Sequence, residues 1–207
     1  MGPNRLPVLD GPWEGRPHTG GKSAAALSSY ALENLRQNSG MVLDESADDS
    51  LVNRAATLVT AANAVAVSSF TAFLDDSPWL KDIDLKDWDF FITVAGVFVG
   101  LTKLNKVQLP ADRLDQLFDI IAKQLDAFHK NGGAAVDDCT AFYDRGMDDP
   151  AILDSYSRDQ ARFISADIIG MWLCWNLLRH APEQTREHEL ARRLGIIVTQ
   201  GFSNWWD

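Results

Sequence analysis

The chain has 207 residues, of which 29 are acidic and 19 basic, and its formal charge at pH 7 is −10. Apolar residues make up 46 % and charged residues 23 %, which is typical of a globular protein and excludes a disordered chain. The negative charge repels phosphate backbones, so it argues against nucleic-acid binding and favours a basic protein partner. We find no apolar segment behind a basic start, and we therefore expect a cytoplasmic protein that does not bind a membrane.

The N-terminal residues 1–21 are rich in proline and glycine, which disfavour regular structure, so we expect an irregular arm there. Apolar residues such as Trp13 indicate that this arm lies along the domain or against a partner, although a plain flexible terminus is the alternative. Residues 22–207 are predicted to form one all-helical domain. Its first helix is expected from Ser23 to about Gln37, where apolar residues recur near helical spacing.

A long helix is predicted from about Asp49 to Leu74, because apolar residues recur there at three- and four-residue intervals. Many of them are alanines, so the surface that this helix presents to its neighbours is shallow. The segment from Trp79 to Leu85 then crosses to the most apolar run of the chain.

That run, from Trp88 to Leu104, has Thr93 as its only polar side chain between Phe90 and Leu101. A helix there has no polar face, so it must be surrounded by protein, and at about 12 to 15 apolar residues it is shorter than a membrane span. Aspartates at 84 and 87 favour a helix start just before it. A buried strand is the weaker alternative, because several residues of the run are β-branched.

Two glycines of this run, Gly96 and Gly100, lie four residues apart on one side of the expected helix. Because glycine has no side chain, a neighbouring helix is able to approach closely there. The alanine-rich surface of the long helix is the predicted neighbour, since two faces of small residues pack more closely than two faces of leucines.

The second half of the chain predicts four more helical segments and a second buried helix. Leu109-Pro110 begins an amphipathic helix with proline at its first position, and Asn131-Gly132-Gly133 is expected to end it. Two shorter segments follow, at Ala135 to Arg145 and around Ile152 to Tyr156. Ser157 and Gln160 have the spacing of a capping box, which predicts a buried helix from there to about His180.

After Pro182, residues 183–200 predict the last amphipathic helix. The fold expected from these segments is all-α: a single-domain bundle of about six to eight helices around two buried apolar helices, with an irregular N-terminal arm.

Catalytic and metal-binding motifs are absent from the sequence: we find no phosphate-binding glycine loop, no G-x-S-x-G and no H-E-x-x-H. Four aspartate pairs could bind magnesium, but each adjoins a predicted helix end or turn, where aspartate caps backbone N–H groups. His180, Glu183, Glu187 and His188 are close in sequence, but Pro182 breaks the helical spacing of a zinc site, so a solvated charged face is favoured. We expect neither a metal nor another cofactor. The pairs are Asp48-Asp49, Asp75-Asp76, Asp137-Asp138 and Asp148-Asp149.

Two polar residues stand on apolar helix faces. Asp167 projects from the apolar side of the second buried helix, so its carboxylate must be neutralised, paired or hydrogen-bonded. The favoured interpretation is a structural contact to an arginine or a free helix end, and the alternative is a polar anchor in a small-molecule pocket. Asn63 is a similar but weaker candidate.

Seven tryptophans are more than a core of this size needs, and several lie in the arm, a loop or the C-terminal tail. Tryptophans in such segments either fold back onto the domain, which is the favoured outcome, or anchor a partner. The candidate partner-binding residues are Trp13, Trp79, Phe202, Trp205 and Trp206.

The charge, the missing catalytic motifs and the aromatic termini favour a non-catalytic interaction protein of the inhibitor, immunity, antitoxin or assembly-subunit kind. One alternative is a helical small-molecule-binding protein or small enzyme, with a pocket between the two central helices that Asp167 orients. Another is a structural subunit that assembles with copies of itself.

Overall fold

The computed structural model of the chain describes residues 45–207, with side chains from Asp49 onward. This part contains seven α-helices and two short 3-10 helices, and no strand occurs within it. The all-α prediction is therefore confirmed, and a strand at residues 90–101 is excluded. The expected arm at residues 1–21 and the expected helix at residues 23–37 lie outside the described residues.

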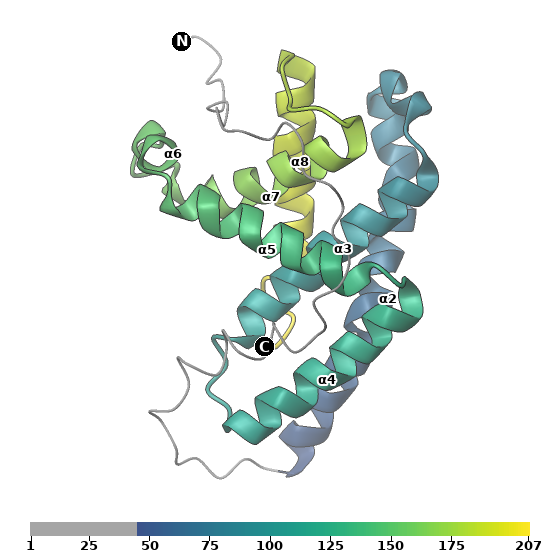
Figure 1. Cartoon of the computed structure of the whole chain (residues 1–207), viewed down its shortest axis with the longest axis vertical. Helices are drawn as coiled ribbons and strands as arrows, with labels where there is room; N and C mark the ends of the chain where they lie inside the picture. The colour runs from purple at the N-terminus through teal and green to yellow at the C-terminus, as the bar shows by residue number, and fades with distance from the viewer. Residues whose placement is uncertain (1–44) are drawn as a thin grey trace.

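The helices keep the labels of Figure 1, in which the first described helix is α2. Each helix predicted from residue 49 onward has a counterpart, although several bounds differ. The α-helices are α2 (Glu45–Asp76), α3 (Leu85–Leu104), α4 (Ala111–Phe128), α5 (Gly132–Asp148), α6 (Pro150–Ser155), α7 (Ile164–Leu178) and α8 (Thr185–Phe202). The 3-10 helices are η1 (Pro78–Asp82) and η2 (Ala161–Phe163).

Helix α3 lies at the centre of the arrangement and packs against α2, α5, α7 and α8 (Figure 1). Every residue of α3 from Ile92 to Leu101 is buried, as the absence of a polar face predicts. The second buried helix is α7, and the two are in contact where the ring of Phe91 packs edge-on against Trp172 at 5.7 Å between centroids. The predicted pair of buried apolar helices is therefore confirmed.

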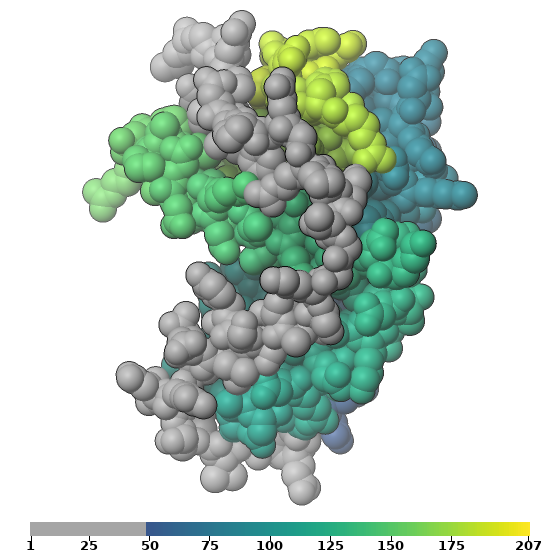
Figure 2. Space-filling model, in the orientation of Figure 1, coloured from purple at the N-terminus to yellow at the C-terminus, as the bar shows by residue number. Residues whose placement is uncertain are grey.

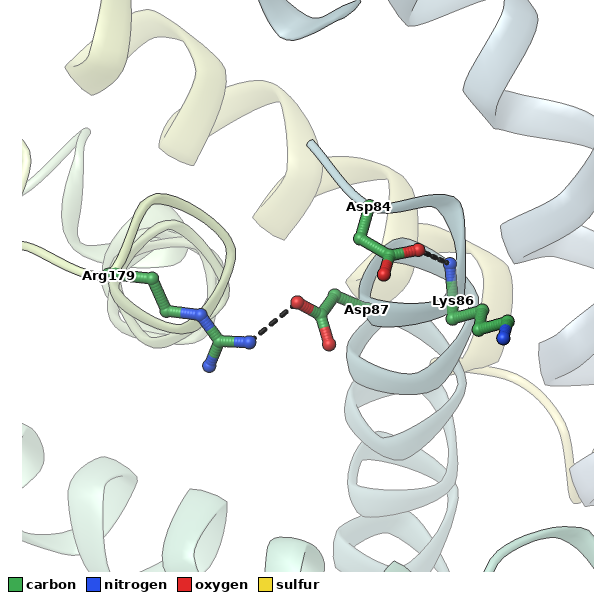
Figure 3. A network of polar contacts seen from close by, with 4 residues as sticks. All are labelled: Asp84, Lys86, Asp87 and Arg179. Atoms are coloured by element: carbon green, nitrogen blue, oxygen red, sulfur yellow. Dashed lines mark hydrogen bonds and ion pairs between the residues drawn. The ribbon is translucent and has the colours of Figure 1, made fainter. Parts of the chain in front are cut away.

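The start of α3 is fixed by the two predicted aspartates, which Figure 3 shows. The carboxylate of Asp84 accepts a hydrogen bond from the backbone N–H of Lys86 at 2.9 Å. Asp87, in the first turn, accepts one from the guanidinium of Arg179 at 2.5 Å. Arg179 ends α7 in the left-handed conformation, with φ of 63°. One surface contact thus joins the N-terminal end of α3 to the C-terminal end of α7.

The close approach of α2 to the two glycines of α3 is also confirmed. A Cβ atom added to Gly96 would lie 2.9 Å from Cβ of Ala62, and one added to Gly100 would lie 2.8 Å from Cδ2 of Leu58. Nearby, the indole N–H of Trp88 donates to the backbone oxygen of Ala66 at 3.0 Å. The backbone of α2 is accessible to that indole because its alanine side chains are short.

A still closer crossing joins α7 and α8. A Cβ atom added to Gly170 would lie 1.8 Å from the backbone oxygen of Ala191, and one added to Gly195 would lie 1.8 Å from the backbone oxygen of Ala166. These contacts are between backbones, so no rotamer change is able to relieve them. The two glycines therefore set the distance between α7 and α8.

Three predicted helix boundaries are wrong. Pro110 is the N-cap of α4 rather than its first helical residue. Helix α5 begins at Gly132 and not at the predicted Ala135. The position of Gly132 is close-packed, because an added Cβ atom would lie 2.7 Å from Cγ of Leu125. The side-chain oxygen of Gln160 accepts from the N–H of Ser157 at 3.2 Å, but this contact closes a turn, and α7 begins only at Ile164.

By length and composition alone, residues Asp49–Asp76 of α2 would be able to cross a membrane, and no other helix in residues 45–207 meets that criterion. Core helices of water-soluble proteins meet it too, so it is weak evidence for a membrane span. One face of α2 is used inside the protein, where Ala55, Leu58 and Ala62 are fully buried.

Candidate functional site

The segment from α4 to α6 carries an unusual share of the negative charge. Residues 111–154 contain ten aspartates and four basic residues, so six of the ten net negative charges lie on 44 of the 207 residues. Helices α4 and α5 lie on the side turned to the viewer in Figure 1, with α6 at the left edge, and parts of α4 and α5 are visible in Figure 2. We call the exposed carboxylates of this segment the acidic surface. They belong to Asp112, Asp115, Asp119, Asp126, Asp138, Asp144, Asp148 and Asp154.

The amphipathic pattern of α4 explains why its carboxylates face outward. Leu114, Leu117, Ile121 and Leu125 are buried against the rest of the domain, which leaves the aspartates on the opposite side. Lys123 pairs with Asp119 at 2.6 Å, but both side chains are largely exposed and such a pair contributes little to stability.

The carboxylates of α5 are crowded. Burial raises the pKa of Asp144, and the nearby carboxylate of Asp148 raises it further. Burial also raises the pKa of Asp137. Asp138 accepts a hydrogen bond from the indole of Trp172 at 2.9 Å, which ties this surface to the buried helix α7. The carboxylates of Asp144 and Asp148 therefore repel each other, and a cation bound to α5 would reduce that repulsion.

Asp167 is buried, as its place on an apolar helix face predicts, with 1 % of its side chain exposed. The hydroxyl of Tyr156 donates to its Oδ2 at 2.9 Å, and Nε of Arg192 lies 3.7 Å from its Oδ1. Burial raises the pKa of Asp167, while the hydrogen bond from Tyr156 and the charge of Arg192 oppose that shift. The carboxylate thus lies close to an arginine, the kind of contact that the favoured interpretation expects.

The partners of Asp167 could not be found from the sequence. Tyr156 follows α6, and Arg192 is on α8, so neither is at helical spacing from Asp167. The contacts of the carboxylate lead to these two segments and not to α3. Asn63 likewise makes a structural contact, since its amide donates to the hydroxyl of Thr93 on α3 at 3.3 Å.

The aromatic C-terminal tail folds back onto α3. Phe202 is 2 % exposed and lies against Gly96, and Trp206 is 8 % exposed and donates from its indole to the backbone oxygen of Gly100 at 2.7 Å. Both side chains are therefore used in the core, which is the favoured outcome for the tail aromatics and leaves neither ring exposed as a partner anchor. Gly96, which admits Ala62 of α2, also leaves room for the ring of Phe202.

The other tryptophan candidates differ in position. Trp205 is half-buried, and its indole donates to the backbone oxygen of Arg54 at 3.1 Å. Trp79 is half-buried as well, with the guanidinium of Arg186 4.9 Å from the centre of its ring. Trp13 lies outside the described residues. Trp79 and Trp205 therefore stay candidates for partner contact only through their exposed edges.

Two of the acidic side chains that the sequence places in candidate metal sites cap helices instead. Glu187 accepts from the backbone N–H groups of Glu183 and Gln184, at 2.9 and 3.1 Å, and caps α8. Burial acts to raise the pKa of Glu187, but these two bonds together with the charges of His180 and Arg186 outweigh it and the pKa is lowered. Asp149 caps α6. Within residues 45–207 no three metal-binding side chains come together.

Replacement of Tyr156 by phenylalanine is expected to lower the free energy of unfolding by about 1 to 3 kcal/mol, because it leaves a buried carboxylate oxygen without a donor. Urea denaturation measures the change. Tyr143→Phe is the matched control, since Tyr143 bonds only to the hydroxyl of Ser165, at 2.9 Å, in a half-buried contact. A loss for Tyr156→Phe no larger than that for Tyr143→Phe would contradict the structural role of the Asp167 contact.

Comparison of the chain with protein-family models, with curated proteins and with solved structures gave no match in any of the three. We therefore infer the function from the charge and geometry of the chain alone.

Proposed function

We propose that the protein is a non-catalytic interaction module that binds a basic protein partner through its acidic surface. The observation that carries this proposal is the concentration of charge: ten aspartates against four basic residues in residues 111–154. Inhibitors, immunity proteins, antitoxins and assembly subunits all fall within this class.

The negative charge of the acidic surface is proposed to attract a basic partner and to speed its association. A cluster of like charges attracts an oppositely charged partner during diffusion and raises the association rate, in a manner that salt screens. The same cluster disfavours acidic partners and nucleic acids, because like charges brought together cost free energy. The crowded carboxylates of α5 add to the attraction, since a cation relieves their mutual repulsion.

The test is a charge-neutralised variant of α4, Asp112→Asn combined with Asp115→Asn, Asp119→Asn and Asp126→Asn. We expect its association with the partner purified from the native cell extract to be about tenfold slower than wild type at low salt, with a weaker dependence on salt. Stopped-flow mixing at several salt concentrations measures both quantities. Circular dichroism before mixing verifies that the variant is folded.

A matched control changes the net charge by the same amount elsewhere: Asp75→Asn, Asp82→Asn, Glu183→Gln and Glu189→Gln, all at exposed positions. The control is expected to associate at close to the wild-type rate, because its charges lie outside the proposed surface. Equal slowing of the two variants would show that net charge alone steers the partner, and an unchanged rate for the α4 variant would contradict the proposal.

A further inference from the structure

The contact of Asp167 joins three segments that are separate in the sequence. Tyr156 belongs to the connection between α6 and η2, Asp167 to the first turn of α7, and Arg192 to the middle of α8. Asp167 is buried, yet only one of its two carboxylate oxygens has a hydrogen bond. Oδ1 of Asp167 therefore accepts no hydrogen bond.

Arg192 is the group that faces this oxygen without completing the bond. The 3.7 Å between Nε and Oδ1 exceeds the range of an N–H···O hydrogen bond, about 2.7 to 3.2 Å. The Arg192 side chain is 41 % exposed, and its guanidinium lies 5.8 Å from the centre of the Phe163 ring, which the guanidinium of Arg162 also contacts at 4.7 Å. The guanidinium of Arg192 thus lies near two groups, the buried carboxylate of Asp167 and the ring of Phe163.

Several other polar and charged groups on the helices around α7 have partners other than Asp167. On α8, Glu187 accepts from the backbone N–H groups of Glu183 and Gln184. On α5, Asp138 bonds to Trp172, and Tyr143 bonds to Ser165. On α3, Asp87 bonds to Arg179. The charge of Asp167 therefore acts mainly on Arg192 and on the hydroxyl of Tyr156.

We propose that Asp167 and Arg192 form a pH-dependent latch between α7 and α8. Ionised Asp167 draws the guanidinium of Arg192 onto Oδ1, because a buried carboxylate needs a charged donor. When Oδ1 takes up a proton, the attraction is lost and Arg192 moves to the ring of Phe163, beside Arg162. The bond from Tyr156 to Oδ2 remains in both states. The latch is independent of the acidic surface and goes beyond the proposed function.

Nuclear magnetic resonance of the wild-type protein tests the latch directly. The side-chain carboxyl carbon of Asp167 and Nε of Arg192 are followed from acid to neutral pH. We expect both resonances to titrate with one midpoint, and that midpoint to lie above the ordinary aspartate pKa of 3.8, because burial raises the pKa of Asp167. A midpoint at or below 3.8, or an Arg192 resonance that does not follow Asp167, would overturn the proposal.

Two variants identify the partner. Arg192→Gln removes the charge that opposes protonation, so the midpoint of Asp167 should shift upward. Arg193→Gln, one residue along α8, breaks a surface pair with Asp76 at 2.6 Å and should leave that midpoint in place. Equal shifts in the two variants would contradict a specific latch. If Arg192→Gln does not fold, the shared wild-type midpoint still decides the question.

The pH dependence of stability gives a second readout with a definite sign. A carboxyl group whose pKa is raised by folding holds its proton more tightly in the folded state, so its stabilising effect is complete below the unfolded pKa and declines as the pH rises through the folded pKa. The stability of wild type relative to Asp167→Asn should therefore fall between about pH 4 and the folded midpoint. A rise over that interval would indicate an ordinary ion pair and overturn the latch.

Discussion

Replacement of Gly170 by alanine is expected to lower the free energy of unfolding by about 3 kcal/mol or more. The added methyl group would lie 1.8 Å from the backbone oxygen of Ala191, so α7 and α8 would have to separate along their crossing. Gly195→Ala should have a similar effect, because its methyl group would lie 1.8 Å from the backbone oxygen of Ala166. Chemical denaturation followed by circular dichroism measures both losses.

Gly201→Ala is the matched control, since Gly201 is also on α8 but nothing lies within 4 Å of an added Cβ atom. This substitution should be neutral or stabilise the protein by up to about 1 kcal/mol, because alanine favours helix more than glycine does. A stability for Gly170→Ala within about 0.5 kcal/mol of wild type would show that the two backbones are not in contact.

Replacement of Trp206 by alanine is the second large effect, with an expected loss of about 3 to 5 kcal/mol. The variant removes a ring that is 8 % exposed and leaves the backbone oxygen of Gly100 without its indole donor. Thermal or urea unfolding measures the loss.

Leu153→Ala provides the comparison, since Leu153 is an exposed apolar residue of α6 and its truncation should change stability by no more than about 0.5 kcal/mol. If Trp206→Ala were as stable as wild type, the indole would not be part of the core, and a partner-binding role for the tail would be restored.

The parts of the fold that could be predicted depend on signals within single segments. Helix α3 has no polar face, so it must be buried in any arrangement of the other helices. Asp84 caps α3 through a contact within the same segment. The pairing of α2 with α3 could also be predicted, because the glycines of α3 admit the apolar face of α2, with Ala62 against Gly96 and Leu58 against Gly100. The apolar run, the cap and the shape of each helix face follow from the residues of one segment, so the sequence alone contains these features.

The parts that could not be predicted depend on contacts between distant segments. Gly195 is one glycine in an amphipathic helix, and nothing nearby in the sequence indicates that it meets Gly170. Gly132 resembles a helix stop until Leu125 is placed beside it. The aromatic residues of the tail would suit a core or a partner interface equally well. Their place in the core depends on their contacts with the glycine positions of α3, which lie about 100 residues away in the sequence.

In the candidate site, too, the features that belong to one helix could be predicted and the contacts between distant segments could not. The outward side of α4 follows from its amphipathic pattern, so four carboxylates of the acidic surface could be placed on a wet face from the sequence. The burial of Asp167 could be predicted from its helix face, but Tyr156 and Arg192 could not, because they reach it from other segments.

Carboxyl footprinting tests the central claim, the acidic surface as the partner-binding site, most directly. The protein is labelled at exposed aspartates and glutamates with and without its partner, and mass spectrometry gives the labelling of each residue. The proposal predicts reduced labelling of the α4 carboxylates, and unchanged labelling at the exposed Asp75 and Glu189. Protection at Asp75 and Glu189 with full labelling of α4 would contradict it.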